Sequence, residues 1–170
     1  MKQSEIYAEE LKAAEKAWDE ACQRKYRKGI SDDEKKKASE EVEKWYQEKL
    51  RLEIAVRAAK NQELEVGDGC TYHLWSDAYA CTVIKKTAKT ITVQRDKATL
   101  DPSFKPKFVT GGFSAHCTNN NDQSYTYERD ESGNVYKLYW HEKTGRWQNG
   151  SGSGAFVLTV GRHEFYDYNF

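Results

Sequence analysis

The sequence has no long apolar run, only two prolines and no excess of charge of either sign. The first residues, MKQSEIYAEELKAAEKAW, intersperse charged with apolar residues, so we expect neither a secretory signal peptide nor a membrane span, and a cytoplasmic location. The 27 Lys and Arg are balanced by 27 Asp and Glu. Polymeric nucleic acid and membrane surfaces attract cationic faces, so we do not expect either as a partner. A local cationic pocket remains compatible with this balance.

The cysteines show no CxxC spacing. They are Cys22, Cys70, Cys81 and Cys117. In a reducing compartment they are expected to be free thiols. Cys70 with His73, and His116 with Cys117, would supply zinc ligands, but these spacings on a strand direct the two side chains of each pair to opposite faces. No metal and no cofactor are therefore expected.

Signatures of catalysis and of phosphate-binding loops are also missing. There is no GxSxG, no P-loop and no GxGxxG. Cys117, His116 and Asp122 could be combined into a nucleophilic triad, but no local motif supports it. The acids Asp96 and Asp101 stand among lysines, which is typical of charge-paired loop residues. We expect no catalytic residues and no enzymatic activity.

Residues 1–62 predict two amphipathic helices. Apolar residues recur every three or four positions from Gln3 to Lys28, and again from Ser31 to about Lys60. Gly29 is the expected stop of the first helix, because glycine adopts the left-handed cap conformation without steric cost. Ser31 opens SDDE, a capping box with Glu34.

The short connection predicts an antiparallel helical hairpin. A two-helix hairpin buries little alone, so its large aromatics need a further surface. They are Trp18, Trp45 and Tyr46. The surface could belong to a second subunit, which would make the hairpin an oligomerisation arm, or to the β half of the same chain.

Residues 63–170 predict a β-barrel domain built from short β-branched and aromatic runs. The expected strands are Cys70–Trp75, Ala80–Lys86, Thr90–Gln94, Ser124–Arg129, Val135–His141, Arg146–Trp147, Ala155–Val160 and a closing aromatic–polar alternation in RHEFYDYNF. Pro102 and Pro106 exclude a central strand from residues 95–112, which we interpret as an extended excursion. The predicted fold class is α+β: an N-terminal antiparallel helical hairpin followed by an SH3-like, mostly antiparallel β-barrel.

Residues 111–129, GGFSAHCTNNNDQSYTYER, form a polar stretch with almost no aliphatic side chain. Such a stretch inside a compact domain is more often functional or disordered than idle. Together with neighbouring segments it offers a ring, amides and cations, which nucleotide-like ligands require. The candidate ligand-binding residues are Phe113, His116, Asn119, Asn120, Arg129, Arg95, Lys97 and Arg162. Each alone is better explained as an ordinary surface or loop residue, but together they favour a site.

Four strings carry a resemblance to a known family. They are VGDGCTYHLWSDAYACTVI, TITVQRDKATLDPSFKPKF, GGFSAHCTNNNDQSYTYE and GRHEFYDYNF. Residues 64–170 resemble the phage Thoeris anti-defence sponge proteins, which capture glycocyclic ADP-ribose. The resemblance implies a non-enzymatic protein that binds a cyclic immune signal in the host cytoplasm. It also implies a homo-oligomer, dimer-based or hexameric, with cyclic trinucleotides held at separate sites.

On this interpretation Phe113 stacks on adenine, Asn119 and Asn120 contact polar edges, and Arg95, Arg129 and Arg162 hold the diphosphate. The chief alternative is a protein–protein interaction module that blocks a host or phage partner, with no small molecule bound. A third is a hydrolase of the same ligand that uses His116 or Cys117. The sequence does not fix the isomer of the ligand or the number of subunits.

Overall fold

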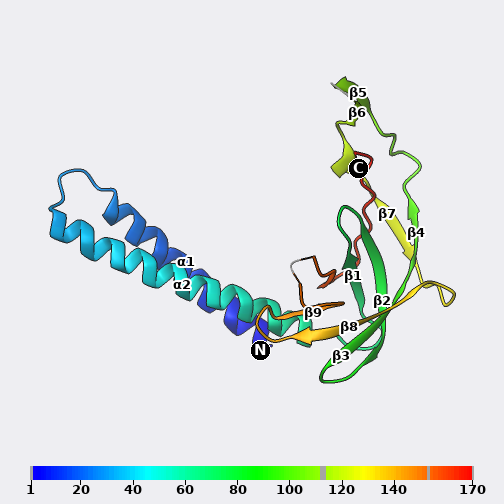
Figure 1. Ribbon diagram of the computed structural model, residues 1–170, viewed down its shortest axis with the longest axis horizontal. Coiled ribbons are helices and arrows are strands. Elements are labelled where there is room, and N and C mark those ends of the chain that lie inside the picture. The colour runs from blue at the N-terminus through cyan, green and yellow to red at the C-terminus, as the bar shows by residue number, and fades with distance from the viewer. Residues whose placement is uncertain (1, 112–113, 153, 170) are drawn as a thin grey trace. The chain divides into compact units, whose positions relative to one another are not determined.

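The computed structural model describes residues 2–111, 114–152 and 154–169, and the chain divides into two compact units, Met1–Gln62 and Glu63–Phe170 (Figure 1). The first unit is a pair of helices and the second contains all the strands of the described chain. The predicted α+β architecture, a helical hairpin followed by a mostly antiparallel β-barrel, is confirmed. Within the described residues, neither helix carries an apolar stretch long enough to cross a bilayer.

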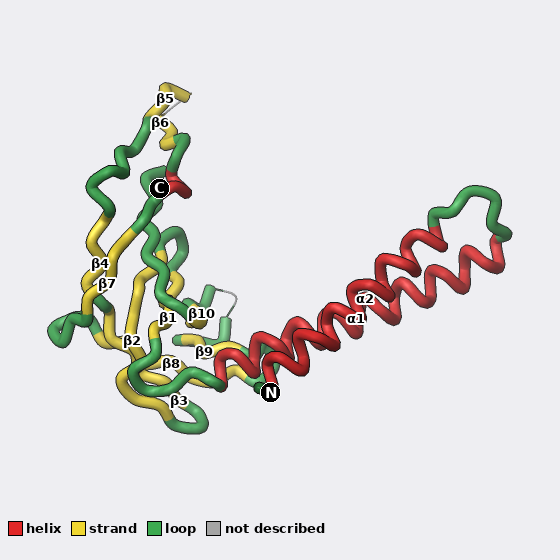
Figure 2. The backbone as a smooth tube through the Cα atoms, turned by 180° about the vertical axis from the view of Figure 1, so that it is seen from behind, coloured by secondary structure: helices red, strands yellow, loops and turns green. Residues whose placement is uncertain are grey.

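The helical unit consists of α1 (Gln3–Lys25) and α2 (Asp32–Gln62), which run side by side in Figures 1 and 2. The predicted capping box is confirmed: the N–H of Ser31 donates to Oε2 of Glu34 at 2.9 Å, and the N–H of Glu34 lies 3.3 Å from the Ser31 hydroxyl. The prediction that α1 extends to Lys28 is wrong. Tyr26 already leaves the helical conformation, at φ −99° and ψ 7°, because reversing the chain direction takes several non-helical residues. Gly29 lies further along this turn with φ 81°.

The β unit is a closed barrel in which every pairing is antiparallel. The barrel strands are β1 (Gly69–His73), β2 (Ala78–Lys86), β3 (Thr90–Arg95), β8 (Val135–His141), β9 (Arg146–Gln148) and β10 (Val157–Val160). Their spatial order is β1–β10–β9–β8–β3–β2. The last strand pairs with β1 on one side and β9 on the other, which closes the barrel.

The barrel interior is filled by side chains that alternate inward along the strands. Its buried members are Leu64, Cys70, Tyr72, Cys81, Val83, Ile91, Val93, Leu138, Trp147 and Leu158. Because β1 and β2 pair Cys70 directly with Cys81, both thiols point into this core and neither is exposed. Burial raises the pKa of the Cys81 thiol to about 12, so the core cysteines are inert packing residues.

The chain leaves the barrel after β3 and returns to it at β8. In this excursion β4 (Lys97–Leu100) pairs with β7 (Tyr125–Glu128), and β5 (Phe108–Gly111) pairs with β6 (Ser114–Cys117). Pro102 and Pro106 lie between β4 and β5, outside any strand, as their chemistry requires. The polar stretch is therefore not one loop, since it contains β6, a 3-10 turn at Asn120–Asp122 and β7.

The C-terminal segment after β10 was expected to be a strand, and this is wrong. Its described residues, 161–169, form no strand and make one isolated bridge, between Phe165 and Ala78. Most of its other bonds go to side chains of the barrel and the excursion, so the segment crosses both without joining a sheet.

Candidate anion-binding site

A buried carboxylate, Asp96, lies where the chain passes from β3 to β4. Its side chain is 1% exposed, and the Thr82 hydroxyl on β2 lies 2.8 Å from both carboxylate oxygens. The backbone N–H of Asp96 donates to the carbonyl of Ala80 (2.9 Å), which fixes the residue against the barrel. Asp96 is charge-paired and lies outside any strand, as predicted, but it is buried and its partners are arginines instead of lysines. The next residue, Lys97, points outward instead and pairs with Glu128 at 3.2 Å.

Two arginines from distant parts of the chain neutralise Asp96. Nε of Arg162 donates to Oδ2 at 2.7 Å, and Nη2 of the same residue donates to the Thr82 hydroxyl at 2.8 Å. Nη1 of Arg129 lies 3.3 Å from Oδ1, while its Nη2 donates to Oε1 of Gln94 at 2.7 Å. A buried carboxylate is stable only with such partners, because an unpaired charge in the interior is strongly unfavourable.

Gly69 on β1 makes room for Arg162. A Cβ atom at position 69 would lie 2.6 Å from Nη1 and 2.7 Å from Cγ of Arg162. The close approach of the arginine, and not a positive φ, is the reason for glycine at this position. The Arg162 side chain thus lies directly against the backbone of β1 at Gly69.

A second carboxylate, Glu164, is two residues further along the C-terminal segment and its side chain is 8% exposed. Oε2 accepts the N–H of Ala80 at 2.8 Å, and Oε1 accepts Nη2 of Arg95 at 2.7 Å. The Arg95 guanidinium also covers the ring of Tyr79, with Cζ 3.7 Å from the ring centroid. Burial alone would lower the pKa of Arg95, but the hydrogen bond and charge of Glu164 outweigh it and raise that pKa, so Arg95 stays cationic.

We name these five residues, Arg95, Asp96, Arg129, Arg162 and Glu164, the arginine–carboxylate cluster. Three guanidinium groups face two carboxylates, which leaves one formal positive charge. The side chains of Arg95, Arg129 and Arg162 are 35%, 38% and 35% exposed. Four guanidinium nitrogens donate to no group that the structure describes: Nε and Nη1 of Arg95, Nε of Arg129 and Nη1 of Arg162. Exposed N–H donors with a net positive charge can bind phosphate or carboxylate oxygens.

The amides predicted to contact a ligand are engaged inside the protein. Oδ1 of Asn119 accepts the N–H of Lys107 at 2.7 Å, and its Nδ2 donates to the carbonyl of Lys105 at 3.0 Å. Nδ2 of Asn120 donates to Oδ1 of Asp167 at 2.8 Å, while its Oδ1 lies 3.2 Å from the N–H of Tyr168. Both residues therefore join the polar stretch to its neighbours, namely the excursion and the C-terminal segment.

The remaining candidates are dispersed. Lys97 and His116 are exposed on β4 and β6, and Phe113 lies outside the described residues. On β6 His116 is exposed whereas Cys117 is buried, since neighbouring side chains of a strand face opposite ways. His116 is thus not aimed at the Cys117 thiol. The carboxylate of Asp101 accepts the N–H of Ser103 in a turn, at 2.8 Å, instead of pairing with a lysine.

Metal ligands do not converge in the described part of the chain: it holds no group of three or more His, Cys, Asp or Glu side chains that could bind an ion. The predicted divergence of Cys70 and His73 is confirmed. Cys70 is in the core, whereas a ring nitrogen of His73 lies 2.8 Å from the hydroxyl of the exposed Thr159. Burial is the main reason that the pKa of His73 is lowered.

The sequence interpretation missed Glu164 together with Thr82, Tyr79 and Gln94. One signal was present. In an extended segment, side chains two positions apart point to the same side. The sequence therefore indicated that Arg162 and Glu164 would contact the same surface. Their partners, Arg95 and Asp96 at the end of β3, could not be identified from the sequence, because the pairing depends on the register of the barrel strands.

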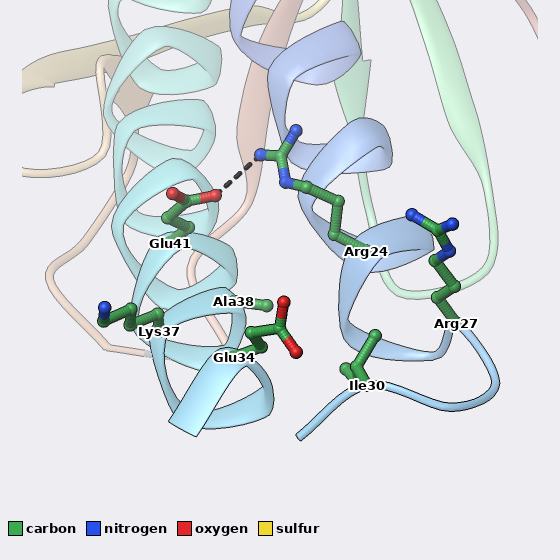
Figure 3. A pocket seen from close by; sticks show the side chains of 7 residues that line it. All are labelled: Arg24, Arg27, Ile30, Glu34, Lys37, Ala38 and Glu41. Carbon is green, nitrogen blue, oxygen red and sulfur yellow. Dashed lines mark hydrogen bonds and ion pairs between the residues drawn. The ribbon is translucent and has the colours of Figure 1, made fainter. Parts of the chain in front are cut away.

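A separate pocket of about 230 Å³ lies in the helical unit, between the end of α1 and the start of α2 (Figure 3). Its lining residues are Arg24, Arg27, Ile30, Glu34, Lys37, Ala38 and Glu41. Nη2 of Arg24 pairs with Oε2 of Glu41 at 2.6 Å across the helices. The pocket has the same excess of one cation over its acids as the arginine–carboxylate cluster, but the side chains of Arg24 and Glu41 are 55% and 50% exposed, so water screens their charges more strongly.

Comparisons of the chain with protein-family models, with curated proteins and with solved structures returned no match.

Proposed function

We propose that the β unit binds and sequesters a small phosphate-bearing molecule of the cyclic ADP-ribose class, without converting it. The observation that carries the proposal is the arginine–carboxylate cluster, where Arg95, Arg129 and Arg162 exceed their internal counter-charges by one. The family resemblance supplies the ligand class, and by it the protein would act as a phage anti-defence sponge. The cluster supplies a chemical reason why such a ligand would be retained.

A diphosphate suits this arrangement because its oxygens can accept from several guanidinium groups together. Each charge-assisted hydrogen bond contributes about 1.5–3 kcal/mol. The arginines are held in place by Asp96, Glu164 and Tyr79, so little side-chain entropy is lost when an anion binds. A phosphate would accept from N–H groups of the three arginines that carry no internal bond, such as Nη1 of Arg95 and Nε of Arg129, and would leave the internal bonds intact.

The hydrogen bonds of the two buried carboxylates, Asp96 and Glu164, support binding without conversion of the ligand. A general base must accept a proton from the reacting group. The oxygens of Asp96 already accept from Thr82 and two arginines, and those of Glu164 accept from Arg95 and the N–H of Ala80. The cluster is therefore suited to holding an anion and poorly suited to proton transfer.

The direct test is to incubate the purified protein with cyclic ADP-ribose isomers and with linear ADP-ribose, and to measure binding by calorimetry. The bound fraction is then released by denaturation and analysed by mass spectrometry. Intact ligand supports sequestration, converted ligand supports the hydrolase alternative, and no retention of any compound overturns both.

Arg129→Ala tests the site itself. Asp96 keeps Arg162 and Thr82 in this variant, so the barrel should remain folded. We expect the affinity to fall about tenfold or more, the equivalent of one charge-assisted bond. The matched control is Arg51→Ala, which removes an exposed arginine paired with Glu48 on α2 and should leave the affinity unchanged. Unchanged affinity in Arg129→Ala would remove that residue from the site.

A second candidate function is the interaction module. One observation favours it: β5 is exposed along its length, with Phe108 52% and Val109 50% exposed. An apolar edge of this kind can pair with a strand of another protein. Capture of one host or phage protein that is lost in Val109→Lys and retained in Arg129→Ala would favour this function over ligand sequestration.

A further inference from the structure

Gln94 lies near the end of β3, is only 9% exposed and makes three hydrogen bonds through its side chain. Oε1 accepts Nη2 of Arg129 at 2.7 Å, whereas Nε2 donates to the carbonyls of Glu131 at 2.7 Å and Gly133 at 3.1 Å. Arg129 directly follows β7, and the two carbonyls belong to the turn that leads into β8. The Gln94 amide therefore holds both the guanidinium and the backbone next to it.

The partners of the amide determine its orientation. If its oxygen and nitrogen were exchanged, the amide NH₂ group would face a donor of Arg129, and the oxygen would face two carbonyl oxygens. The turn itself is fixed against β3, because the N–H of Arg95 donates to the carbonyl of Asn134 at 2.9 Å and the Arg95 carbonyl leaves no room for a Cβ at Gly133. The amide oxygen is thus held toward Arg129.

Charge distinguishes Gln94 from the partners of the other two arginines. Arg95 and Arg162 each lie 2.7 Å from an oxygen of a buried carboxylate. The 2.7 Å bond of Arg129 goes to a neutral amide instead. Its contact with Asp96 is longer, at 3.3 Å, and Arg162 already neutralises that carboxylate. Arg129 is therefore the least compensated cation of the arginine–carboxylate cluster.

Three acids flank Arg129 in the sequence, but its guanidinium pairs with none of them in the part of the chain that the structure describes. The carboxylate of Glu128 lies 3.2 Å from Nζ of Lys97. That of Asp130 accepts the N–H and the hydroxyl of the serine two positions along, at 2.9 and 2.7 Å. Glu131 is exposed, so water screens its charge. These acids leave the charge of Arg129 uncompensated at short range.

We infer that Gln94 is a positioning residue of the anion-binding site: it holds the Arg129 guanidinium in place and, being uncharged, leaves that cation available to an anion. The inference rests on the proposed function and names a residue that determines how tightly the site binds. Glutamate at this position would also accept from Arg129, but its negative charge would cancel the excess of the cluster. Methionine would add no charge but would release the guanidinium, which would then lose side-chain entropy when an anion binds. A neutral acceptor supplies both properties.

Calorimetry of the full chain with linear ADP-ribose and with inorganic pyrophosphate tests this role in Gln94→Met and Gln94→Glu. We expect Kd to rise about tenfold in Gln94→Met, the equivalent of one charge-assisted bond, and to rise further in Gln94→Glu. The new carboxylate of Gln94→Glu would face two carbonyl oxygens. If that variant does not fold, Gln94→Met alone decides the test.

Gln148→Met is the matched control. Gln148 on β9 is 6% exposed, and its amide bonds the Thr144 hydroxyl at 3.0 Å and the Gly150 carbonyl at 2.9 Å. It is thus a second buried amide that joins neighbouring segments, and among the described residues its side chain bonds to no arginine. We expect Gln148→Met to lose stability in urea as Gln94→Met does, but to keep the affinity of the natural chain for both probes.

The Nε–H resonance of Arg129 in proton–nitrogen correlation NMR, assigned by its loss in Arg129→Ala, reports the guanidinium directly. We expect it to shift or broaden in Gln94→Met and to stay unchanged in Gln148→Met. An unmoved resonance in Gln94→Met, or an affinity equal to that of the natural chain, would overturn the inference and leave the proposed function standing. A natural chain that binds neither probe, nor a cyclic ADP-ribose isomer, would overturn both.

Discussion

The substitution Asp96→Asn removes one charge from the interior of the β unit while it keeps the size of the side chain. The Asp96 carboxylate accepts from Thr82, Arg129 and Arg162, and the side chain is 1% exposed. Asparagine has one acceptor oxygen in place of two and carries a donor where the second stood. It therefore leaves a donor facing a guanidinium and two arginines without their counter-charge.

The expected loss of stability follows from the burial of both sides of the pair. Removing one partner of a fully buried ion pair costs about 3–5 kcal/mol. The two arginine side chains are 38% and 35% exposed, so water compensates part of their charge. We therefore expect the free energy of unfolding of the β unit to fall by about 3 kcal/mol, the lower end of the range.

Urea unfolding followed by near-ultraviolet circular dichroism measures this change, because the fully buried Trp147 reports the packing of the barrel. The matched control is Asp101→Asn, where the carboxylate accepts the N–H of Ser103 in a turn at the surface. We expect that control to lose at most about 1 kcal/mol. If Asp96→Asn loses no more than the control, the cluster does not hold the fold together and the reasoning is refuted.

Three further predictions address single contacts. Gly69→Ala should destabilise the barrel by about 1–3 kcal/mol through its clash with Arg162, and the loss should nearly vanish in an Arg162→Ala background, as a double-mutant cycle of urea unfolding would show. Because the pKa of His73 is lowered in the folded protein, the unfolded chain binds its proton first, so stability should fall as the pH drops below about 6.5, and less so in His73→Gln. Thiol labelling with Ellman's reagent should modify the partly exposed Cys22 quickly and the buried Cys81 only after unfolding, and rapid labelling of Cys81 would contradict its place in the core.

Local signals in the sequence predicted most of the secondary structure. The helical periodicity and the Ser31–Glu34 capping box depend on residues within one or two turns of each other, and both elements form where expected. The strand Val135–His141 was predicted with its observed bounds, since its alternation and flanking turn are equally local. The end of α1 was misplaced by three residues, because a glycine marks a turn without fixing how many residues enter it.

The candidate site could be predicted only in part, because its contacts join residues far apart in the chain. Arg162 and Asp96 are 66 positions apart, and the pairing depends on barrel closure and on the space at Gly69. The arginines were identified by residue type. Their counter-ions were not, because Asp96 stands beside a lysine in sequence, whereas in the fold Asp96 is buried and Lys97 is exposed.

The Asn and Gln side chains of residues 119–123 have a structural role that the sequence alone did not reveal. Where segments cross without forming a ladder, their backbone N–H and C=O groups still need partners. Asn and Gln can serve both kinds of group, because each carries a donor and an acceptor. Asn119 bonds one N–H and one C=O of the excursion, and Gln123 donates to the carbonyl of Tyr166 at 2.7 Å and lies 3.2 Å from the N–H of the same residue. A run of amides inside a β domain thus predicts irregular crossing backbone as well as it predicts a ligand. The partly exposed arginines of the arginine–carboxylate cluster, with their excess of one positive charge, are therefore the stronger argument for anion binding.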